Sequence, residues 1–342
     1  MFPALLEQLQ RHHTLTVDQA TDAMAAIMRG EVGPATIAGF LMALRSKGER
    51  PEELVGLARA MRAAAVSVDA GAGLVFDTCG TGGDGAGTVN VSSMSAVVVA
   101  ACGVRVAKHG NRSVSSRCGS ADVFEALGVN VAATPEVVAR CLRDPGLAFL
   151  FAPTFHPSMR HAGPVRRELG VRTAFNLLGP LTNPAGARRQ LVGVPRPELT
   201  ELVARALGLL GSDCVWVMHA ADGLDELTTT GYTKVSECRA GVLRTFFVHP
   251  AEFGLPKATL AQLTGGAAAD NAGIARAVFD GQQGPVRDIV VLNAGASLFI
   301  AGAAPDVATG MAMAARALAE GRASAVLQRL VEQSHVAEES PA

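Results

Sequence analysis

Apolar residues recur every three or four positions through the first seventy residues, a spacing typical of amphipathic helices. One run begins with a capping box of Thr16 and Gln19 and ends at Gly30, and two further runs each follow a proline. The pattern predicts three short helices in an all-helical N-terminal domain, residues 1–70, with part of segment 160–187 packed on it. Its expected role is structural, as a dimer surface, and a lid over a substrate is the alternative.

From residue 73 the pattern changes to short apolar runs that alternate with helical segments. Strands are expected at 74–77, 104–107, 147–151, 190–194 and 214–219, and helices at 93–102, 120–127, 135–142 and 197–209. This alternation predicts an α/β fold with a mostly parallel central sheet flanked by helices, residues 71–336. A hairpin is expected at 233–238 and 243–248. Helices are expected again over 268–334, and the tail 337–342 is expected to be disordered.

Five glycines within eight positions follow the first expected strand, and a hydroxyl-rich segment, 90–95, then opens an apolar helix. The glycines are Gly80, Gly82, Gly83, Gly85 and Gly87. Glycine lets backbone N–H groups approach a ligand closely, and a helix N-terminus adds unpaired N–H groups and a positive dipole end. Together these features predict an anion site, most often one for phosphate. The alternative is an ordinary strand-to-helix turn that binds nothing.

The second expected strand leads into a polar loop with Lys108, His109, Asn111 and Arg112. The glycine loop contains a G-x-G-x-x-G pattern but is not a Walker A loop. A dinucleotide-binding fold would end the next strand with an acidic residue, and Lys108 stands there instead. Because the carboxyl ends of parallel strands meet at one edge of a sheet, these cations and the loop predict a cleft for a heavily phosphorylated small molecule.

Three carboxylates, Asp222, Asp225 and Glu226, follow the strand expected at 214–219. Adjacent carboxylates repel each other unless a cation or solvent lies between them. Magnesium prefers oxygen ligands and usually takes one or two carboxylates together with substrate phosphates. The spacing leaves both magnesium binding and a solvated acidic turn open, and the expected phosphate cleft in the same sheet favours magnesium.

An arginine-rich segment contains Arg166, Arg167 and Arg172. One of these arginines could clamp a carboxylate through two parallel hydrogen bonds, and the others are interpreted as surface or ion-pair residues. The residue types do not indicate which arginine does so. The following segment, 175–184, is interpreted as a tight, turn-rich hinge between the sheet and the helical bundle.

Two histidines near Pro157, His156 and His161, are interpreted as structural, whereas His109 lies among polar residues at a strand end. The chain has no Ser-His-Asp grouping with a nucleophile-elbow pattern. Covalent catalysis is therefore not expected.

Composition narrows the classes of function. The 342 residues suffice for two domains, and the net charge of -1 gives no basic field for a nucleic-acid partner. No apolar run approaches the roughly 20 residues of a membrane span, and the N-terminus lacks the pattern of a secretory signal, so no membrane partner is expected. The six cysteines form no C-x-x-C pair, so zinc is not expected. They are interpreted as buried or incidental thiols in a reducing cytoplasm.

The loop, the acidic cluster and the arginine segment resemble the anthranilate phosphoribosyltransferase family, and the resemblance covers nearly the whole chain. The matching motifs, in the family's order, are 80–84, 90–93, 108–112, 119–122, 164–167 and 222–226. A late segment, 265–294, is also similar. Ser113, Phe124 and Ser158 depart from the family's pattern, and none of these departures removes a chemical group that the reaction needs.

This resemblance implies a fold of the nucleoside phosphorylase and phosphoribosyltransferase type, a homodimer and a cytoplasmic location. It implies transfer of phosphoribose from phosphoribosyl pyrophosphate (PRPP) to the amine of anthranilate, with release of pyrophosphate. That reaction is the second step from chorismate toward tryptophan. An aromatic amine is neutral at pH 7 and needs orientation more than deprotonation, so no general base is expected.

The resemblance also assigns residues to the two substrates and to magnesium. PRPP is expected to contact Gly80, Gly83, Asp84, Thr88, Asn90, Val91, Ser92, Ser93, Lys108, His109, Gly110, Asn111, Arg112, Ser113, Val114, Ser115, Ser116 and Ser120. Anthranilate is expected to contact Gly80, Asn111 and Arg166. Two Mg²⁺ ions are expected, with Ser92, Asp225 and Glu226 as ligands.

Two rival functions share this kind of fold. A pyrimidine nucleoside phosphorylase also has a glycine phosphate loop, but it would use inorganic phosphate and no paired acidic metal loop. Asp225, Glu226 and the segment 108–112 argue against it. A non-catalytic relative that binds nucleic acid would show a basic groove and damaged substrate motifs, and the sequence shows neither.

Overall fold

The computed structural model describes residues 1–113 and 117–336, and it is built on one seven-stranded sheet. The strands are β1 Phe76–Gly80, β2 Val106–Gly110, β3 Leu147–Phe151, β4 Arg189–Gly193, β5 Cys214–Ala220, β6 Thr233–Arg239 and β7 Val242–Val248. Their order is β3-β2-β1-β4-β5-β6-β7, with β1 to β5 parallel and β6 and β7 forming an antiparallel hairpin. The predicted α/β fold, its mostly parallel sheet and the hairpin are confirmed.

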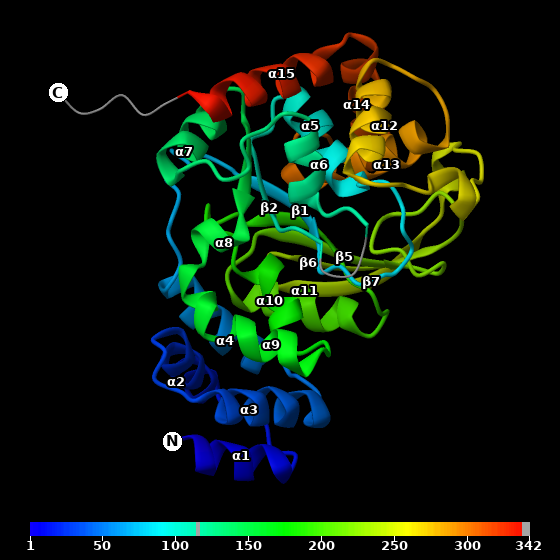
Figure 1. Ribbon diagram of the computed structural model, residues 1–342. Coiled ribbons are helices and arrows are strands. Elements are labelled where there is room, and N and C mark those ends of the chain that lie inside the picture. The colour runs from blue at the N-terminus through cyan, green and yellow to red at the C-terminus, as the bar shows by residue number, and fades with distance from the viewer. Residues whose placement is uncertain (114–116, 337–342) are drawn as a thin grey trace, which may run out of the picture.

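Helices cover both faces of the sheet (Figure 1). One face carries α5 Val91–Ala101, α6 Ser120–Ala126, α7 Pro135–Arg143, α12 Ala268–Phe279, α13 Pro285–Ala301, α14 Val307–Ala319 and α15 Arg322–His335. The other carries α10 Phe175–Leu181, α11 Leu199–Leu209 and the N-terminal bundle. Side chains of β5 alternate accordingly: Trp216 and Met218 join the first core, whereas Val215 and Val217 join the second.

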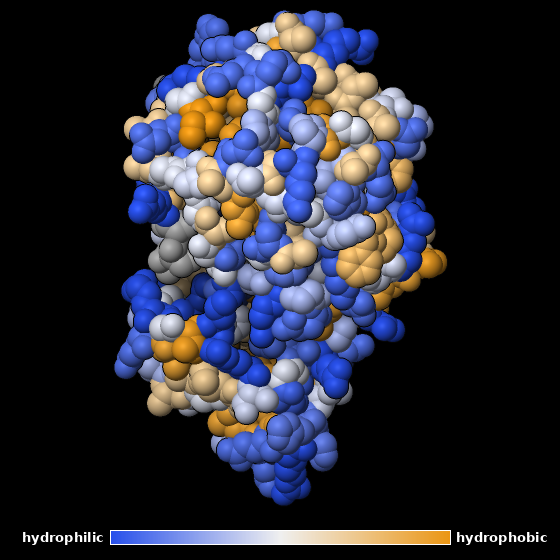
Figure 2. Space-filling model, turned by 90° about the vertical axis from the view of Figure 1, so that its right-hand side faces the viewer, coloured by the Kyte–Doolittle hydropathy of each residue, from blue (hydrophilic) through white to orange (hydrophobic). Residues whose placement is uncertain are grey.

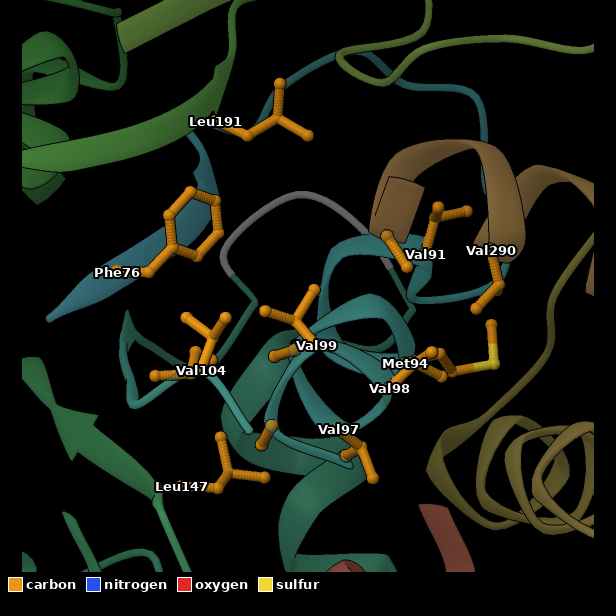
Figure 3. Close-up of a cluster of buried hydrophobic side chains, with 14 of the residues drawn as sticks. Phe76, Val91, Met94, Val97, Val98, Val99, Val104, Leu147, Leu191 and Val290 are labelled. Atoms are coloured by element: carbon orange, nitrogen blue, oxygen red, sulfur yellow. The ribbon is translucent and has the colours of Figure 1, made fainter. Parts of the chain in front are cut away.

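Helix α5 is apolar on almost all sides and lies in the centre of the first core. Figure 3 shows its valines and Met94 packed between Phe76 of β1, Leu191 of β4 and Val290 of α13. Burial on every side fixes the helix against the sheet. Its N-terminus, at Val91, therefore has a fixed position at the end of the glycine loop.

The N-terminal bundle has four helices where the sequence predicts three. They are α1 Phe2–Gln10, α2 Val17–Met28, α3 Pro34–Lys47 and α4 Pro51–Ala63. Helix α1 has no capping side chain, but Phe2, Leu5 and Leu9 are buried, and Phe2 packs edge-on against Phe40. Tertiary burial therefore forms a helix whose local signals are weak. Helices α9 Gly163–Leu169 and α10 contact α3 and α4.

Two local expectations are wrong. Lys108, His109 and Gly110 belong to β2 and pair with β3, so they do not lie in a loop. The segment 175–184 begins with helix α10, because Leu177, Leu178 and Leu181 are buried against the second core. In both places pairing or burial outweighs the local preference of polar residues, glycine and proline for turns.

Candidate active site

A cavity of about 790 Å³ lies at the carboxyl ends of the parallel strands. Strand order reverses between β1 and β4, and a doubly wound sheet opens its ligand crevice at that point. The cavity is lined by residues of the glycine loop, the end of β2, helix α9 and the loop after β5. Figure 2 shows a hydrophilic hollow between the part that carries the bundle and the α/β part.

The glycine loop packs closely on the acidic loop that follows β5. A methyl group added to Gly80 would overlap the Asp225 carboxylate, and one added to Gly193 would overlap the Asp225 backbone. The Gly82 N–H donates to Asp225 Oδ2 at 3.3 Å. Glycine at these positions therefore brings the ends of β1, β4 and β5 into contact.

Lys108 lies beneath this loop with 1% of its surface exposed. Its Nζ donates to the Thr78 carbonyl at 2.6 Å and to Ser92 Oγ at 3.1 Å. Burial lowers the pKa of Lys108, and the nearby Asp77 and Glu226 carboxylates offset part of that effect. The Asp77 carboxylate accepts hydrogen bonds from the His109 N–H and from Asn183 Nδ2, which fixes β2 beside β1.

Asp225 and Glu226 are the least compensated carboxylates of the cleft. Burial and the neighbouring Asp84 raise the pKa of Asp225 to about 6. Burial and Asp225 raise the pKa of Glu226 well above its ordinary value. Glu226 Oε1 accepts the Ser92 N–H at 3.0 Å, but Oε2 is buried with no partner among the described residues. Two repelling carboxylates with an unsatisfied oxygen fit a divalent cation that prefers oxygen ligands.

Residues 1–113 and 117–336 contain no group of three or more His, Cys, Asp or Glu side chains placed to hold a metal. A cation at Asp225 and Glu226 would therefore need further oxygen ligands from a bound phosphate. Asp222 belongs to another arrangement. Its carboxylate accepts hydrogen bonds from Thr228 Oγ1, Thr230 Oγ1 and the Leu224 N–H, so it shapes the turn and lies outside the cavity lining.

Two buried imidazoles, His109 and His156, form part of the cavity wall with ring centroids 5.1 Å apart. His109 Nδ1 lies 3.1 Å from the Gly179 carbonyl, and Nε2 of both rings is buried without a partner among the described residues. Burial, together with His156, lowers the pKa of His109 to about 3, and burial lowers that of His156 to about 4. Both rings are neutral at pH 7. The interpretation of His156 as structural overlooked its place in this wall.

The cavity arginines differ in their partners. Arg112 is paired with Asp122 at 3.0 Å and with Glu125 at 2.7 Å, so its guanidinium binds helix α6 rather than standing ready for phosphate. Arg166 lies 5.2 Å from the centre of the Phe175 ring and has no carboxylate or carbonyl partner in the described chain. An arginine with this environment can receive a carboxylate from a ligand.

Arg172, like Arg167, has no substrate role in the sequence interpretation but lies in the cavity wall. Its Nη2 donates to the Thr81 carbonyl of the glycine loop at 3.1 Å. A second residue of this kind is Asn271, whose Nδ2 donates to Asn90 Oδ1 at 2.9 Å and whose Oδ1 accepts the Gly266 N–H at 2.7 Å. Neither role has a local sequence signal, because each depends on a contact across more than ninety residues.

The structure brings together all the predicted site residues that it describes. The cavity is lined by Gly80, Gly83, Asp84, Thr88, Asn90, Val91, Ser92, Ser93, Lys108, His109, Gly110, Asn111, Arg112, Ser113, Ser120, Arg166, Asp225 and Glu226. The predicted contacts Val114, Ser115 and Ser116 lie outside the described residues. The arrangement combines a glycine loop, a helix N-terminus, a buried lysine and two carboxylates. It suits a sugar that carries several phosphates together with a divalent cation.

Two family models that match this chain define the class of protein to which it belongs. Residues 72–324 match the a/b domain of a glycosyl transferase family, and residues 3–65 match the helical bundle domain of the same family. The anthranilate phosphoribosyltransferase of Moorella thermoacetica is 53% identical over 97% of this chain and 98% of its own length. That of Desulfatibacillum aliphaticivorans is 50% identical over the same shares of the two chains.

Solved structures agree. The anthranilate phosphoribosyltransferase of Thermus thermophilus matches with a TM-score of 0.92 and 46% identity, over 97% of this chain and 99% of that one. The Saccharomyces cerevisiae enzyme in complex with PRPP and Mg matches with a TM-score of 0.89 and 26% identity, over 97% of both chains. The chain belongs to the anthranilate phosphoribosyltransferase family.

Proposed function

We propose that this chain transfers the phosphoribosyl group of PRPP to the amine of anthranilate, giving N-(5-phosphoribosyl)anthranilate and pyrophosphate. This is the second step of tryptophan biosynthesis from chorismate. The observation that carries the proposal is the cavity at the β1/β4 switch point, where the glycine loop, Lys108 and the Asp225-Glu226 pair meet. Relatives that share about half of the residues over nearly the whole chain support it.

We assign PRPP to the side of the cavity formed by the glycine loop and the N-terminus of α5. Backbone N–H groups of the loop and the positive end of the α5 dipole would receive the pyrophosphate. The predicted PRPP contacts at positions 80–93, 108–113 and 120 line this side, and Lys108 adds a charge that the protein has already desolvated. Anthranilate is assigned to Gly80, Asn111 and Arg166, with Arg166 receiving its carboxylate.

Asp225, Glu226 and Ser92 would hold Mg²⁺, and we propose two ions per site. The Ser92 hydroxyl already accepts a hydrogen bond from Lys108, and its backbone N–H orients Glu226. Mg²⁺ bound there would neutralise charge on the departing pyrophosphate. A yeast relative in complex with PRPP and Mg supports this choice of metal.

The residues of the chain would act by positioning and by electrostatics. Positive charge develops on the ribose C1 as pyrophosphate leaves, and the loop N–H groups together with Lys108 would stabilise the departing anion. Arg166 and Asn111 would hold anthranilate so that its neutral amine nitrogen faces C1. His109 and His156 stay neutral. Because His109 Nδ1 donates to the Gly179 carbonyl, its Nε2 is an acceptor in this wall.

Fluorescence of anthranilate tests this function directly. Purified protein, PRPP and Mg²⁺ are mixed with anthranilate, and each component is omitted in turn. Loss of fluorescence that needs all of them is the expected result. A folded protein that gives no loss over a range of Mg²⁺ concentrations would refute anthranilate as the acceptor. Phosphorolysis of thymidine or uridine then tests the phosphorylase alternative.

We further propose a division into a helical domain, residues 1–70, and an α/β domain, residues 71–336. A homodimer through the bundle is proposed as well, because Met1, which precedes α1, and Met42 of α3 expose 59% and 38% of their surface. Size-exclusion chromatography with light scattering tests it. We also propose a cytoplasmic location and no nucleic-acid partner. No helix in the described ranges is long and apolar enough to cross a membrane.

A further inference from the structure

Arg172 follows helix α9 and lies in the short segment that joins α9 to α10. These two helices contact the bundle helices α3 and α4, whereas the Arg172 side chain reaches the glycine loop of the α/β part. The residue thus links the substrate loop to the bundle-packed segment. None of the predicted roles uses it.

Its guanidinium fits the loop closely. Nη2 donates to the Thr81 carbonyl at 3.1 Å, and a methyl group added to Gly83 would overlap Nη1. Gly83 also has a φ of +84°, a conformation that favours glycine. The missing side chain at Gly83 therefore has two consequences: the loop can bend, and the planar guanidinium can lie against its backbone.

The same guanidinium lies across one peptide group from a carboxylate that we assign to the metal site. The Thr81 carbonyl accepts its hydrogen bond, and the N–H of the next residue, Gly82, donates to Asp225 Oδ2 at 3.3 Å. Burial lowers the pKa of Arg172, and attraction by Asp225 and by Asp84 offsets part of that effect. In turn, the charge of Arg172 stabilises the charged form of Asp225 and offsets part of the rise in the pKa of that carboxyl. A divalent cation at Asp225 would meet the repulsion of this fixed charge, whereas the phosphates of a substrate would be attracted by both cations.

We propose that Arg172 is a positioning residue that holds the glycine loop for pyrophosphate and makes divalent-cation binding depend on the phosphates of PRPP. Its hydrogen bond to Thr81 and its packing on Gly83 set the loop. Its charge weakens the binding of a divalent cation alone, and phosphate oxygens remove that penalty when they enter between the two cations. The role in PRPP binding rests on the proposed function, whereas the effect on a bare cation does not.

The test replaces Arg172 by Gln, which removes the charge, and by Lys, which keeps the charge but loses the planar fork. For Arg172→Gln the PRPP KM should rise about tenfold, since a charge-assisted hydrogen bond is lost, while the anthranilate KM stays within about twofold. Mn²⁺ alone, without PRPP, should bind roughly three- to tenfold more tightly by electron paramagnetic resonance titration. Arg172→Lys should raise the PRPP KM but leave Mn²⁺ affinity near that of the parent protein.

Arg188→Gln is the matched control. Arg188 also donates to a carbonyl, that of Gly211 at 3.0 Å, and pairs with a carboxylate, Asp213 at 2.6 Å, but it lies outside the cavity lining. A parent-like PRPP KM in Arg172→Gln, or an Mn²⁺ affinity that is unchanged or weaker, overturns the proposal. If the Gln variant does not fold, a parent-like PRPP KM in Arg172→Lys overturns it. Absence of turnover in the parent protein refutes the proposed function instead, and the Mn²⁺ titration still tests Arg172.

Discussion

Glu226, in the loop after β5, and Glu237, on strand β6, are both buried carboxylates, with 8% and 1% of their surface exposed, and their surroundings differ. Glu237 accepts hydrogen bonds from Trp216 Nε1, from Arg239 at 2.8 Å and from Arg244. Burial alone would raise the pKa of Glu237, but these donors outweigh it and lower the pKa. Within residues 1–113 and 117–336, Glu226 has one donor, the Ser92 N–H, and its pKa is raised well above its usual range.

The number of hydrogen-bond donors distinguishes a carboxylate with a structural role from one that can still bind a ligand. A buried charge whose hydrogen-bonding capacity is filled stabilises one conformation, while an unfilled one costs free energy in the folded protein. Glu53 in the bundle follows the first pattern, with the Leu15 N–H at 2.9 Å and Lys47 Nζ at 2.8 Å as donors. Around the cavity, Ser93 Oγ, His109 Nε2 and His156 Nε2 join Glu226 Oε2 as buried atoms without a partner in the described chain.

The largest effect is expected when charge is removed from Asp225 and Glu226, the carboxylates whose hydrogen-bonding capacity is not filled. Asp225→Asn combined with Glu226→Gln should lower Mg²⁺-dependent kcat/KM about 10²- to 10³-fold, because the proposed metal ligands lose their charge. The unfolding free energy should not fall, since two buried carboxylates that repel each other become neutral amides. Steady-state kinetics with Mg²⁺ measure the first effect, and urea denaturation in EDTA measures the second. Full activity with both amides in place would remove this loop from the site.

Substitution of Glu237, whose hydrogen-bonding capacity is filled, should have the opposite result: stability should fall and activity should not. Glu237→Gln should cost about 2–3 kcal/mol of unfolding free energy, at the low end for a buried ion pair because Arg239 and Arg244 are exposed. Its kcat and both KM values should stay near those of the parent protein, since Glu237 lies outside the cavity lining. Urea denaturation beside the fluorescence assay measures both. A variant that keeps its stability but loses turnover would reverse the assignment.

Arginines extend the contrast to cations. Arg112 is paired with Asp122 and Glu125, whereas the only partner of Arg166 among the described residues is the Phe175 ring. Arg166→Ala should therefore raise the anthranilate KM about ten- to a hundredfold, the loss of a charge-assisted hydrogen bond of roughly 1.5–3 kcal/mol. The PRPP KM should change much less. Titration of anthranilate at saturating PRPP measures this effect, and an unchanged anthranilate KM would refute the assignment of Arg166.

The sequence predicts where the charged groups of the site lie, but not which of them already have partners. Apolar periodicity locates the strands of the sheet, and the glycine loop with the charged residues after the strands locates the cavity, because these signals are local. The resemblance to the family supplies most of the individual contact residues. The partners of a buried charge are not local. Glu226 meets Ser92 across 134 positions, and Arg172 meets Thr81 across 91. Pattern reasoning thus names Arg112 as a cation of the site, and the resemblance adds Arg166. Only the fold shows that Asp122 and Glu125 already pair with Arg112.

The smallest expected effect concerns the two imidazoles of the cavity wall. The pKa of His109 is about 3 and that of His156 about 4 in the folded protein, below the value near 6.5 of an unfolded chain. Between these values the unfolded state binds more protons, so stability is full above pH 6.5 and falls as the pH decreases. At pH 5 each ring should cost about 1–2 kcal/mol.

Comparison of two denaturation curves isolates this contribution. Urea denaturation at pH 7 and pH 5 gives the loss for the parent protein, and His109→Gln should lose about 1–2 kcal/mol less between the same two pH values. The Gln side chain does not titrate, and it keeps an N–H donor for the Gly179 carbonyl that now lies beside Nδ1. An equal loss in both proteins would mean that His109 is protonated in the folded state at pH 5. The cavity wall would then present a cation to PRPP instead of a neutral acceptor.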